Sequence, residues 1–166
     1  LAAAALEPLT LTRPVHELWL GCSTLGGKIA GAFGVGPGPQ RRGAMIRSHL
    51  VGVQKQRDPH AAVNDADWLA RGPVAVVNSR WVPPVGFTPP AIHQPYIGFC
   101  DDQPAFAIVG PEDALTIGTN TLGVDSWFDR MASLHPGDDV GGEWIHRPWD
   151  LVARNGAYIE RDFRAF

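Results

Sequence analysis

The apolar run Val74–Val77 constrains the fold more than any other feature of the chain. It reads VAVV, lies between Pro73 and the polar Asn78, and is typical of a strand buried on both faces of a sheet. Strand and helix patterns alternate through the first half of the chain, and a hairpin pattern interrupts the second half. This alternation predicts an α/β domain with a mostly parallel sheet.

Caps, turn residues and apolar spacing predict the other elements. Ser23 or Thr24 is expected to cap one helix and Asn64 or Asp65 another, because short polar side chains accept hydrogen bonds from the first free N–H groups. Asp101-Asp102 is expected to turn a hairpin. We expect helices over 23–33, 49–57, 64–72, 125–134 and from 148 to the end, and another that starts at Pro111. A short strand is expected over 44–48. Loops are expected over 34–43, 85–95 and 135–144.

Length, charge and apolar content exclude several classes of protein. A chain of 166 residues with a net charge of −3 is expected to form one domain that binds neither nucleic acid nor a membrane. No apolar run approaches the ~18 residues of a membrane span, and the start has no basic segment before Glu7, so we expect a cytoplasmic protein. Cys22 and Cys100 form no CxxC pair and are expected to be buried thiols.

The segment LEPLTLTRPVHEL, residues 6–18, carries a recognisable signature. Its Pro8-Leu9-Thr10 resembles the end of the nucleotide-binding loop of sugar-1-phosphate nucleotidyltransferases, L-A-A-G-x-G-T-R-L-x-P-L-T. The chain as a whole is more similar to a sugar nucleotidyltransferase-like N-terminal family related to bifunctional UDP-N-acetylglucosamine pyrophosphorylases. The matching motifs run in order along the chain: Pro8 to Val15 with Glu17-Leu18, Thr24-Leu25 with Lys28, Asn64-Asp65 with Trp68-Leu69, Val77-Asn78 with Arg80, and Pro148 to Val152 with Asn155-Gly156.

The resemblance implies a fold, a domain arrangement and a reaction. The fold would be a Rossmann-like three-layer domain of the nucleotidyltransferase type over residues 1–166. Relatives imply that this is a fragment lacking a first strand and a following β-helix half. A nucleoside triphosphate and a sugar 1-phosphate would give a nucleotide sugar and pyrophosphate, with Mg²⁺ as cofactor if the domain is catalytic. The implied partner is a nucleotide sugar or sugar phosphate, and homo-oligomer formation is left open.

The sequence departs from the family pattern at the groups that hold phosphates. Ungapped alignment places Leu1 and Ala3 at the two loop glycines, and Ala4-Ala5 at the Thr-Arg pair. Val15 stands at the position of the Pro-Lys lysine. Arg80 ends the strand where active enzymes usually carry a metal-binding aspartate, and an arginine cannot ligate Mg²⁺. These departures favour binding over catalysis.

Cations and polar groups elsewhere are the remaining candidates for ligand contacts. Arginine grips phosphate oxygens with a fork of donors, and α/β folds bind ligands at the carboxyl edge of the sheet. For each cation a purely structural role stays open: a solvated loop position for Arg13, a helix surface for Lys28, and an ion pair for Arg80. Asn78 is equally suited to contacting a ligand or capping a turn. The candidate substrate-binding residues are Leu9, Thr10, Arg13, Lys28, Asn78 and Arg80.

Three functional hypotheses follow. The first is a nucleotidyltransferase-like domain that binds a nucleotide sugar or sugar 1-phosphate and transfers a nucleotidyl group. The second is a non-catalytic domain of the same fold that binds a sugar nucleotide or serves in assembly. The third is a hydrolase that uses Asp138, Asp139, Glu143 and His146, although these acids have no fixed ligand spacing. His16-Glu17 lacks the following x-x-H of a zinc protease, and no catalytic residue is assigned.

Overall fold

The computed structural model describes residues 4–36, 42–119 and 124–165. Within these ranges the α-helices are α1 (Leu25–Ala32), α2 (Val51–Arg57), α3 (Ala66–Leu69), α4 (Pro111–Thr119), α5 (Val124–Leu134) and α6 (Pro148–Ala165). The strands are β1 (Trp19–Leu20), β2 (Ser23–Thr24), β3 (Gly43–Ala44), β4 (Ala62–Val63), β5 (Val74–Val77), β6 (Trp81–Val82), β7 (Tyr96–Cys100), β8 (Gln103–Val109), β9 (Gly137–Asp139) and β10 (Glu143–Trp144). Short 3₁₀ turns are η1 (Ala4–Leu6), η2 (Leu9–Leu11), η3 (Val15–Glu17) and η5 (Ser48–Leu50). No helix among the described residues is long and apolar enough to cross a membrane.

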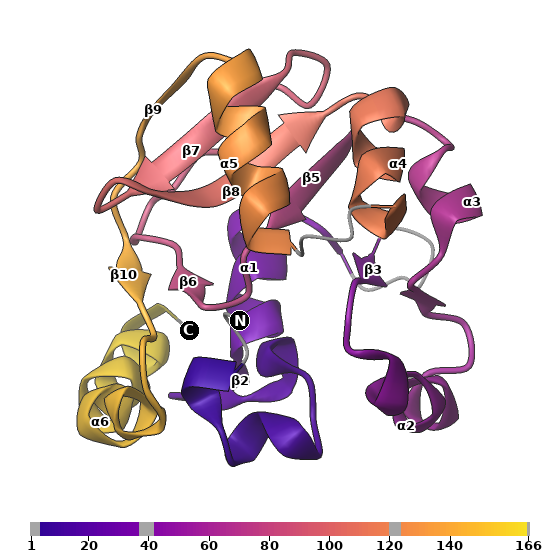
Figure 1. The fold of residues 1–166 in the computed structure, drawn as a ribbon. Coiled ribbons are helices and arrows are strands. Elements are labelled where there is room, and N and C mark those ends of the chain that lie inside the picture. Colours follow the sequence, from indigo (N-terminus) through magenta and orange to yellow (C-terminus); the bar gives the residue numbers. More distant parts are fainter. Residues whose placement is uncertain (1–3, 37–41, 120–123, 166) are drawn as a thin grey trace.

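A four-stranded sheet in the order β5-β8-β7-β9 forms the centre of the molecule (Figure 1). Strand β8 pairs antiparallel with both β5 and β7, whereas β7 and β9 are parallel. The pairs β1–β2 and β6–β10 are antiparallel, and β3–β4 is parallel. The fold is therefore mixed α/β, and the mostly parallel sheet expected from the sequence is not found among the described residues. The reason is that β5 pairs with the hairpin strand β8 and not with a strand reached through a helical crossover.

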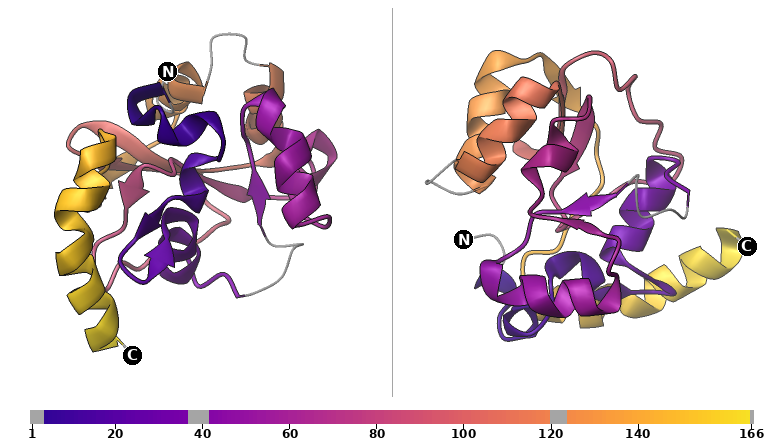
Figure 2. Two further views of the ribbon diagram at one scale, coloured as in Figure 1. Left: turned by 90° about the horizontal axis from the view of Figure 1, so that it is seen from below. Right: turned by 90° about the vertical axis from the view of Figure 1, so that its right-hand side faces the viewer.

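Side chains that alternate along the strands pack into two apolar clusters, one on each face of the sheet. Val74 and Val76 of β5 pack toward α4 and α5, together with Ile97, Ala107 and Val109. Ala75 and Val77 pack on the other face, against Phe106 and Ile108. Figures 1 and 2 show α4 and α5 on one side of the sheet and α1 on the opposite side. Strand β5 is covered on both faces as expected, but its four residues are only half-buried, because it lies at the edge of the sheet.

Aromatic rings close the face opposite α4 and α5. The ring of Phe106 lies within 5.3–5.7 Å of the ring centroids of Phe33, Trp81 and Phe87. Phe33 follows α1, so this contact joins the first helix to the sheet. A third cluster lies beneath the sheet and is made of Leu6, Val15, Leu18, Leu20, Leu25, Val82, Ile145, Leu151 and Tyr158. It brings together the N-terminal segment, α1 and α6.

Local predictions hold well where neighbouring residues decide the structure. The Thr24 hydroxyl accepts from Gly27 N–H at 3.0 Å and caps α1, and Asp65 caps α3 by accepting from Trp68 N–H at 2.9 Å. Asp101 and Asp102 adopt positive φ angles of 49° and 59° at the hairpin turn, as their role there requires. Three expectations were wrong. Cys22 is exposed while Cys100 is buried. The expected loop over 135–144 contains β9 and β10, and of the expected strand over 44–48 only Ala44 lies in a strand, β3.

We predict that Gly98→Ala destabilises the fold by about 2 kcal/mol, because the added methyl group would overlap the ring of Phe106 on the paired strand. Gly52→Ala is the matched control, since a Cβ there meets nothing within 4 Å and alanine favours the α2 helix by up to ~1 kcal/mol. Chemical denaturation measures both. Equal stability of the two variants would contradict the packing described at Gly98.

Candidate functional site

The signature segment at residues 6–18 folds as three short 3₁₀ turns, η1 to η3. Its prolines exclude a continuous helix, as expected. Leu6, Thr10 and Val15 are buried, whereas Leu9 and Arg13 are exposed. The segment therefore presents one apolar side to the core and leaves the guanidinium of Arg13 on the surface.

Residues from η5 and α2 hold this segment from outside. Arg47 forms an ion pair with Glu7 at 3.1 Å, and Arg57 pairs with Glu17. The His49 ring nitrogen Nε2 lies 3.2 Å from the Leu11 carbonyl oxygen. Because the contacts lie at several points along the segment, its path is fixed by polar links to a neighbouring element as well as by burial.

Arg80 lies in the tight turn between β5 and β6. The turn is closed by the Asn78 side chain, whose oxygen accepts from Arg80 N–H at 3.1 Å, and by a bond from Trp81 N–H to the Asn78 carbonyl at 2.9 Å. Asn78 therefore caps the turn, which was one of the two roles its sequence position left open. The guanidinium carbon of Arg80 lies 5.6 Å from the centre of the Trp144 ring.

The charge of Arg80 is partly shielded from water. Burial lowers the pKa of its guanidinium, and the nearby carboxylate of Asp125, in the first turn of α5, opposes that shift. Its Nε–H is buried and has no hydrogen-bond partner, so one strong donor of the fork is unused. Asp125 was not among the candidates from the sequence, because an acid at the start of a helix is common and no further signal marks it.

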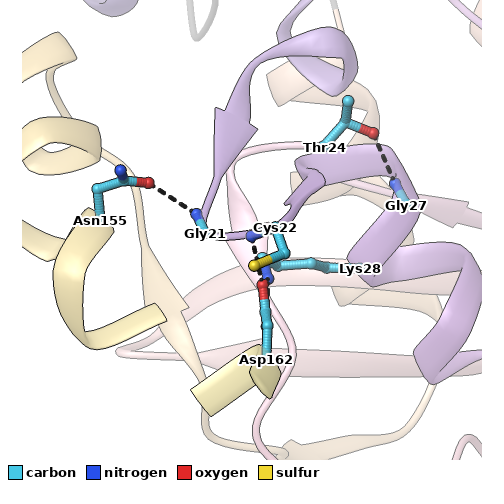
Figure 3. A network of polar contacts seen from close by, with 7 residues as sticks. All are labelled: Gly21, Cys22, Thr24, Gly27, Lys28, Asn155 and Asp162. Atoms are coloured by element: carbon cyan, nitrogen blue, oxygen red, sulfur yellow. Dashed lines mark hydrogen bonds and ion pairs between the residues drawn. The ribbon is translucent and has the colours of Figure 1, made fainter. Parts of the chain in front are cut away.

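Lys28 is held by the last helix of the chain (Figure 3). Its ammonium lies 2.7 and 2.8 Å from the two carboxylate oxygens of Asp162 and 5.2 Å from the centre of the Tyr158 ring. The same carboxylate accepts from Cys22 N–H at 2.7 Å. Asn155 lies on the same face of α6 as Asp162, and its side-chain oxygen accepts from Gly21 N–H at 2.8 Å. These bonds fasten α6 to α1 and to the β1–β2 turn.

The six candidate residues thus occupy different surroundings. Lys28 is committed to Asp162, Asn78 to its own turn, and Thr10 is buried in the N-terminal segment. Among the described residues, Arg13 forms no ion pair, and no acid is shared by Arg13, Lys28 and Arg80. The two cations with donors to spare are therefore Arg13 and Arg80.

The acids at 138–146 each have a separate structural partner. Asp138 accepts from the Tyr96 hydroxyl at 3.3 Å, Asp139 accepts from Gly141 N–H at 2.8 Å, and Glu143 pairs with Arg154 at 2.9 Å. In the described part of the chain, no group of three or more His, Cys, Asp or Glu side chains is placed to hold a metal ion. This arrangement gives the hydrolase hypothesis no support.

The buried Cys100 is not arranged as a nucleophile. Burial, with the carboxylates of Asp101 and Asp139 adding to it, raises the pKa of the Cys100 thiol to about 11, so the thiol stays protonated near neutral pH. Burial likewise lowers the pKa of His16, with Glu17 opposing. The His16 ring packs against Gly26, where an added Cβ would lie 3.1 Å from the His16 Cβ. Cys100 and His16 therefore contribute to packing in this fold.

Comparison with known proteins decides the family. A family model described as sugar nucleotidyl transferase matches residues 2–166. The chain belongs to the sugar nucleotidyl transferase family. This confirms the resemblance drawn from the ordered motifs. No curated protein and no solved structure is significantly similar to the chain.

We predict that Asp162→Asn lowers the free energy of unfolding by about 2 kcal/mol near neutral pH, because Lys28 and Cys22 N–H lose a charged acceptor. Burial alone would raise the pKa of Asp162, but the bonds from Lys28 and Cys22 outweigh it and hold the pKa below its usual value. Because the pKa of Asp162 is lower in the folded state, its carboxylate stabilises the fold at pH values above the unfolded-state pKa of about 3.9. This stabilisation is lost as the pH falls through the folded-state pKa.

The difference between Asp162→Asn and the unchanged protein should therefore shrink between about pH 5 and pH 3. Urea denaturation across that range measures it. Asp129→Asn, at an exposed position of α5, is the control and should change stability by less than ~0.5 kcal/mol. A constant difference at all pH values would show that the carboxylate charge does not carry the contact.

Proposed function

We propose that this domain binds a nucleotide sugar or a sugar 1-phosphate through anion-binding arginines on the side of the signature segment and the β5–β6 turn. The observation that carries the proposal is the family match over residues 2–166. Two features of the described residues support it: the exposed Arg13 in the PLTLTRPV motif and the buried, unpaired Nε–H of Arg80. Phosphate oxygens are the acceptors that suit such donors.

Two forms of this function differ in chemistry. In nucleotidyl transfer, a sugar-phosphate oxygen attacks the α-phosphorus of a nucleoside triphosphate, and pyrophosphate leaves. In the second form the domain binds its ligand without turnover, or serves in assembly. Ala4 and Ala5 replace polar phosphate-holding groups, and Val15 replaces the lysine that would follow them. These replacements favour the second form, because transfer needs donors that stabilise the charge developing on the phosphates.

The residues at the β5–β6 turn do not fit the Mg²⁺ ion that transfer would require. Hard divalent cations take carboxylate and carbonyl oxygens, and the β5 end carries Arg80 with Asp125 as the carboxylate that acts on it. A guanidinium at this point repels a cation. No step is therefore derived through a metal at this turn, and a phosphate bound there would be neutralised by arginine instead.

We expect calorimetry to show binding of at least one ligand among UTP, dTTP, UDP-sugars and sugar 1-phosphates, and binding that persists when Mg²⁺ is removed, because arginine supplies the positive charge. A coupled assay for pyrophosphate release distinguishes the two forms. Release that depends on a sugar 1-phosphate would establish transfer and refute the non-catalytic form. Absence of binding by every ligand would overturn the proposal.

Arg13→Ala and Arg80→Lys should each weaken the binding of that ligand about tenfold, through loss of a forked donor. Lysine at position 80 keeps the positive charge, so a loss there reports the Nε–H and the fork geometry. Arg71→Ala and Arg71→Lys, at an exposed arginine that follows α3, are the matched controls. Unchanged affinity in Arg13→Ala and Arg80→Lys, with unchanged melting temperatures, would return both arginines to structural roles.

A further inference from the structure

The two edges of the central sheet are built from different residues. At one edge, β9 reads Gly137-Asp138-Asp139 and is exposed along its length. Charged side chains on an edge strand discourage other strands from pairing with it. At the other edge, β5 reads VAVV and carries neither a charge nor a proline. Strand β5 therefore lacks the residues that usually protect a free edge.

Strand β5 has the side-chain pattern of an inner strand. Val74 and Val76 pack into the cluster under α4 and α5, and Ala75 and Val77 pack into the cluster on the opposite face. A continuous apolar run of this kind is typical of strands that are covered on both faces and paired on both sides. All four residues are nonetheless only half-buried, so apolar surface of β5 remains exposed where each cluster ends.

The register of β5 shows which of its backbone groups point outward. The Asn78 N–H donates to the Ala105 carbonyl at 2.8 Å, so these two residues form a hydrogen-bonded pair. Such pairs alternate along antiparallel strands, and Val76 therefore directs its N–H and C=O groups to β8, whereas Ala75 and Val77 direct theirs away from it. No described strand pairs with this side of β5, and no backbone bond between the described elements involves Ala75 or Val77.

A second pair of strands lies on the β5 side of the molecule without joining the sheet. Figures 1 and 2 show the parallel pair β3–β4 there. The Trp68 ring lies 3.2 Å from the position of an added Cβ at Gly43 of β3, and it also packs against the cluster that contains Val74 and Val76. Trp68 thus links β3 to the cluster at β5, although these two strands are not paired with each other in the described part of the chain.

We propose that the outer edge of β5 binds one more strand, an extended apolar segment that leads into the chain from ahead of Leu1. The path of the N-terminal segment gives the direction of this strand. Leu6 of η1 packs in the same cluster as Val82 of β6, and β6 follows β5 through the tight turn at Asn78. The N-terminal segment therefore lies at the end of β5, and a strand that leads into it runs parallel to β5.

The surroundings of the edge define the chemistry of the added strand. Ala75 and Val77 offer it their outward N–H and C=O groups, and main-chain hydrogen bonds of this kind hold a strand added to a sheet. Its side chains extend the two clusters that end at β5, one on each face. The strand is therefore apolar at successive positions and not only at alternate ones.

Amide hydrogen exchange of the 166-residue chain, measured by NMR, gives the first test. The amides of Ala75 and Val77 should exchange at least about tenfold faster than the amide of Val76, which is bonded to β8. Sedimentation equilibrium of the same sample shows whether a second copy occupies the edge. Protection of Ala75 and Val77 in a monomer would overturn the free edge, and protection that appears with dimer formation would assign the edge to a second copy and overturn the proposal.

Chains extended at the N-terminus test the occupant. One carries the strand TVIVVT directly before Leu1, a second has a flexible Gly/Ser spacer of about eight residues in between, and the control carries TSGSGT. In both TVIVVT chains, exchange at Ala75 and Val77 should slow at least about tenfold relative to the control, and the melting temperature should rise. Protection that requires the spacer would overturn the parallel entry, and absence of protection in both chains would overturn the proposal.

Proline substitutions separate pairing at the edge from general stabilisation. Proline is tolerated on an edge strand where the missing N–H faces outward, so Ala75→Pro should barely change the melting temperature of the chain without an extension. In the TVIVVT chain, Ala75→Pro should remove most of the gain in melting temperature. Val76→Pro is the matched control, because it deletes a bond to β8 and should destabilise the chain with and without the extension. A TVIVVT chain that keeps its full gain with Ala75→Pro would overturn the proposed pairing.

Discussion

The carboxylate of Asp162 fixes how the last helix lies on the rest of the molecule. It binds the Lys28 ammonium and the Cys22 N–H, so a single group near the chain end holds both α1 and the β1–β2 turn. Asn155 repeats the contact two turns earlier by accepting from Gly21 N–H. Once these side chains face inward, helical geometry leaves no freedom for the others. The exposure of Trp149, Val152 and Phe163 on α6 is thus a consequence of the same contacts that dock the helix.

The Lys28–Asp162 pair also limits what the candidate site contains. A lysine and an arginine are both suited to phosphate, but a charge already neutralised within 3 Å has little attraction left for a ligand. Lys28 has that partner and a neighbouring aromatic ring. Arg13 has no ion pair in the described chain, and Arg80 retains an unused Nε–H although Asp125 acts on its charge. The contacts therefore distinguish Arg13 and Arg80 from Lys28 as candidates for binding an anion, whereas the sequence offered all three equally.

Features that depend on residues close together in the sequence were predicted, and pairings between distant segments were missed. The caps at Thr24 and Asp65, the Asp101-Asp102 turn and helix α6 depend on residues a few positions away, and each was found from local patterns. Strands β9 and β10 were missed because they are short and pair with β7 and β6, far earlier in the sequence. The partner of Lys28 lies 134 residues away. A single sequence holds no local signal for such pairings, and for that reason the expectation of a mostly parallel sheet was also wrong. The family motifs were found because they are short sequence patterns in a fixed order along the chain, and recognising them does not require knowing which strands pair.

The residue type at the turn after β5 determines which ligand groups the turn could attract. A carboxylate there would attract a divalent cation, and the cation would hold the phosphates. Arg80 reverses the sign of that position and carries its own fork of donors to it. The surroundings match the change: Trp144 offers a ring face to the guanidinium, and Asp125 offsets the cost of burying its charge. A ligand phosphate would then contact the protein directly, which binds an anion without activating it for attack. Family membership and a binding role are therefore compatible at this turn, whereas metal-assisted transfer needs a donor set that the described residues around Arg80 do not provide.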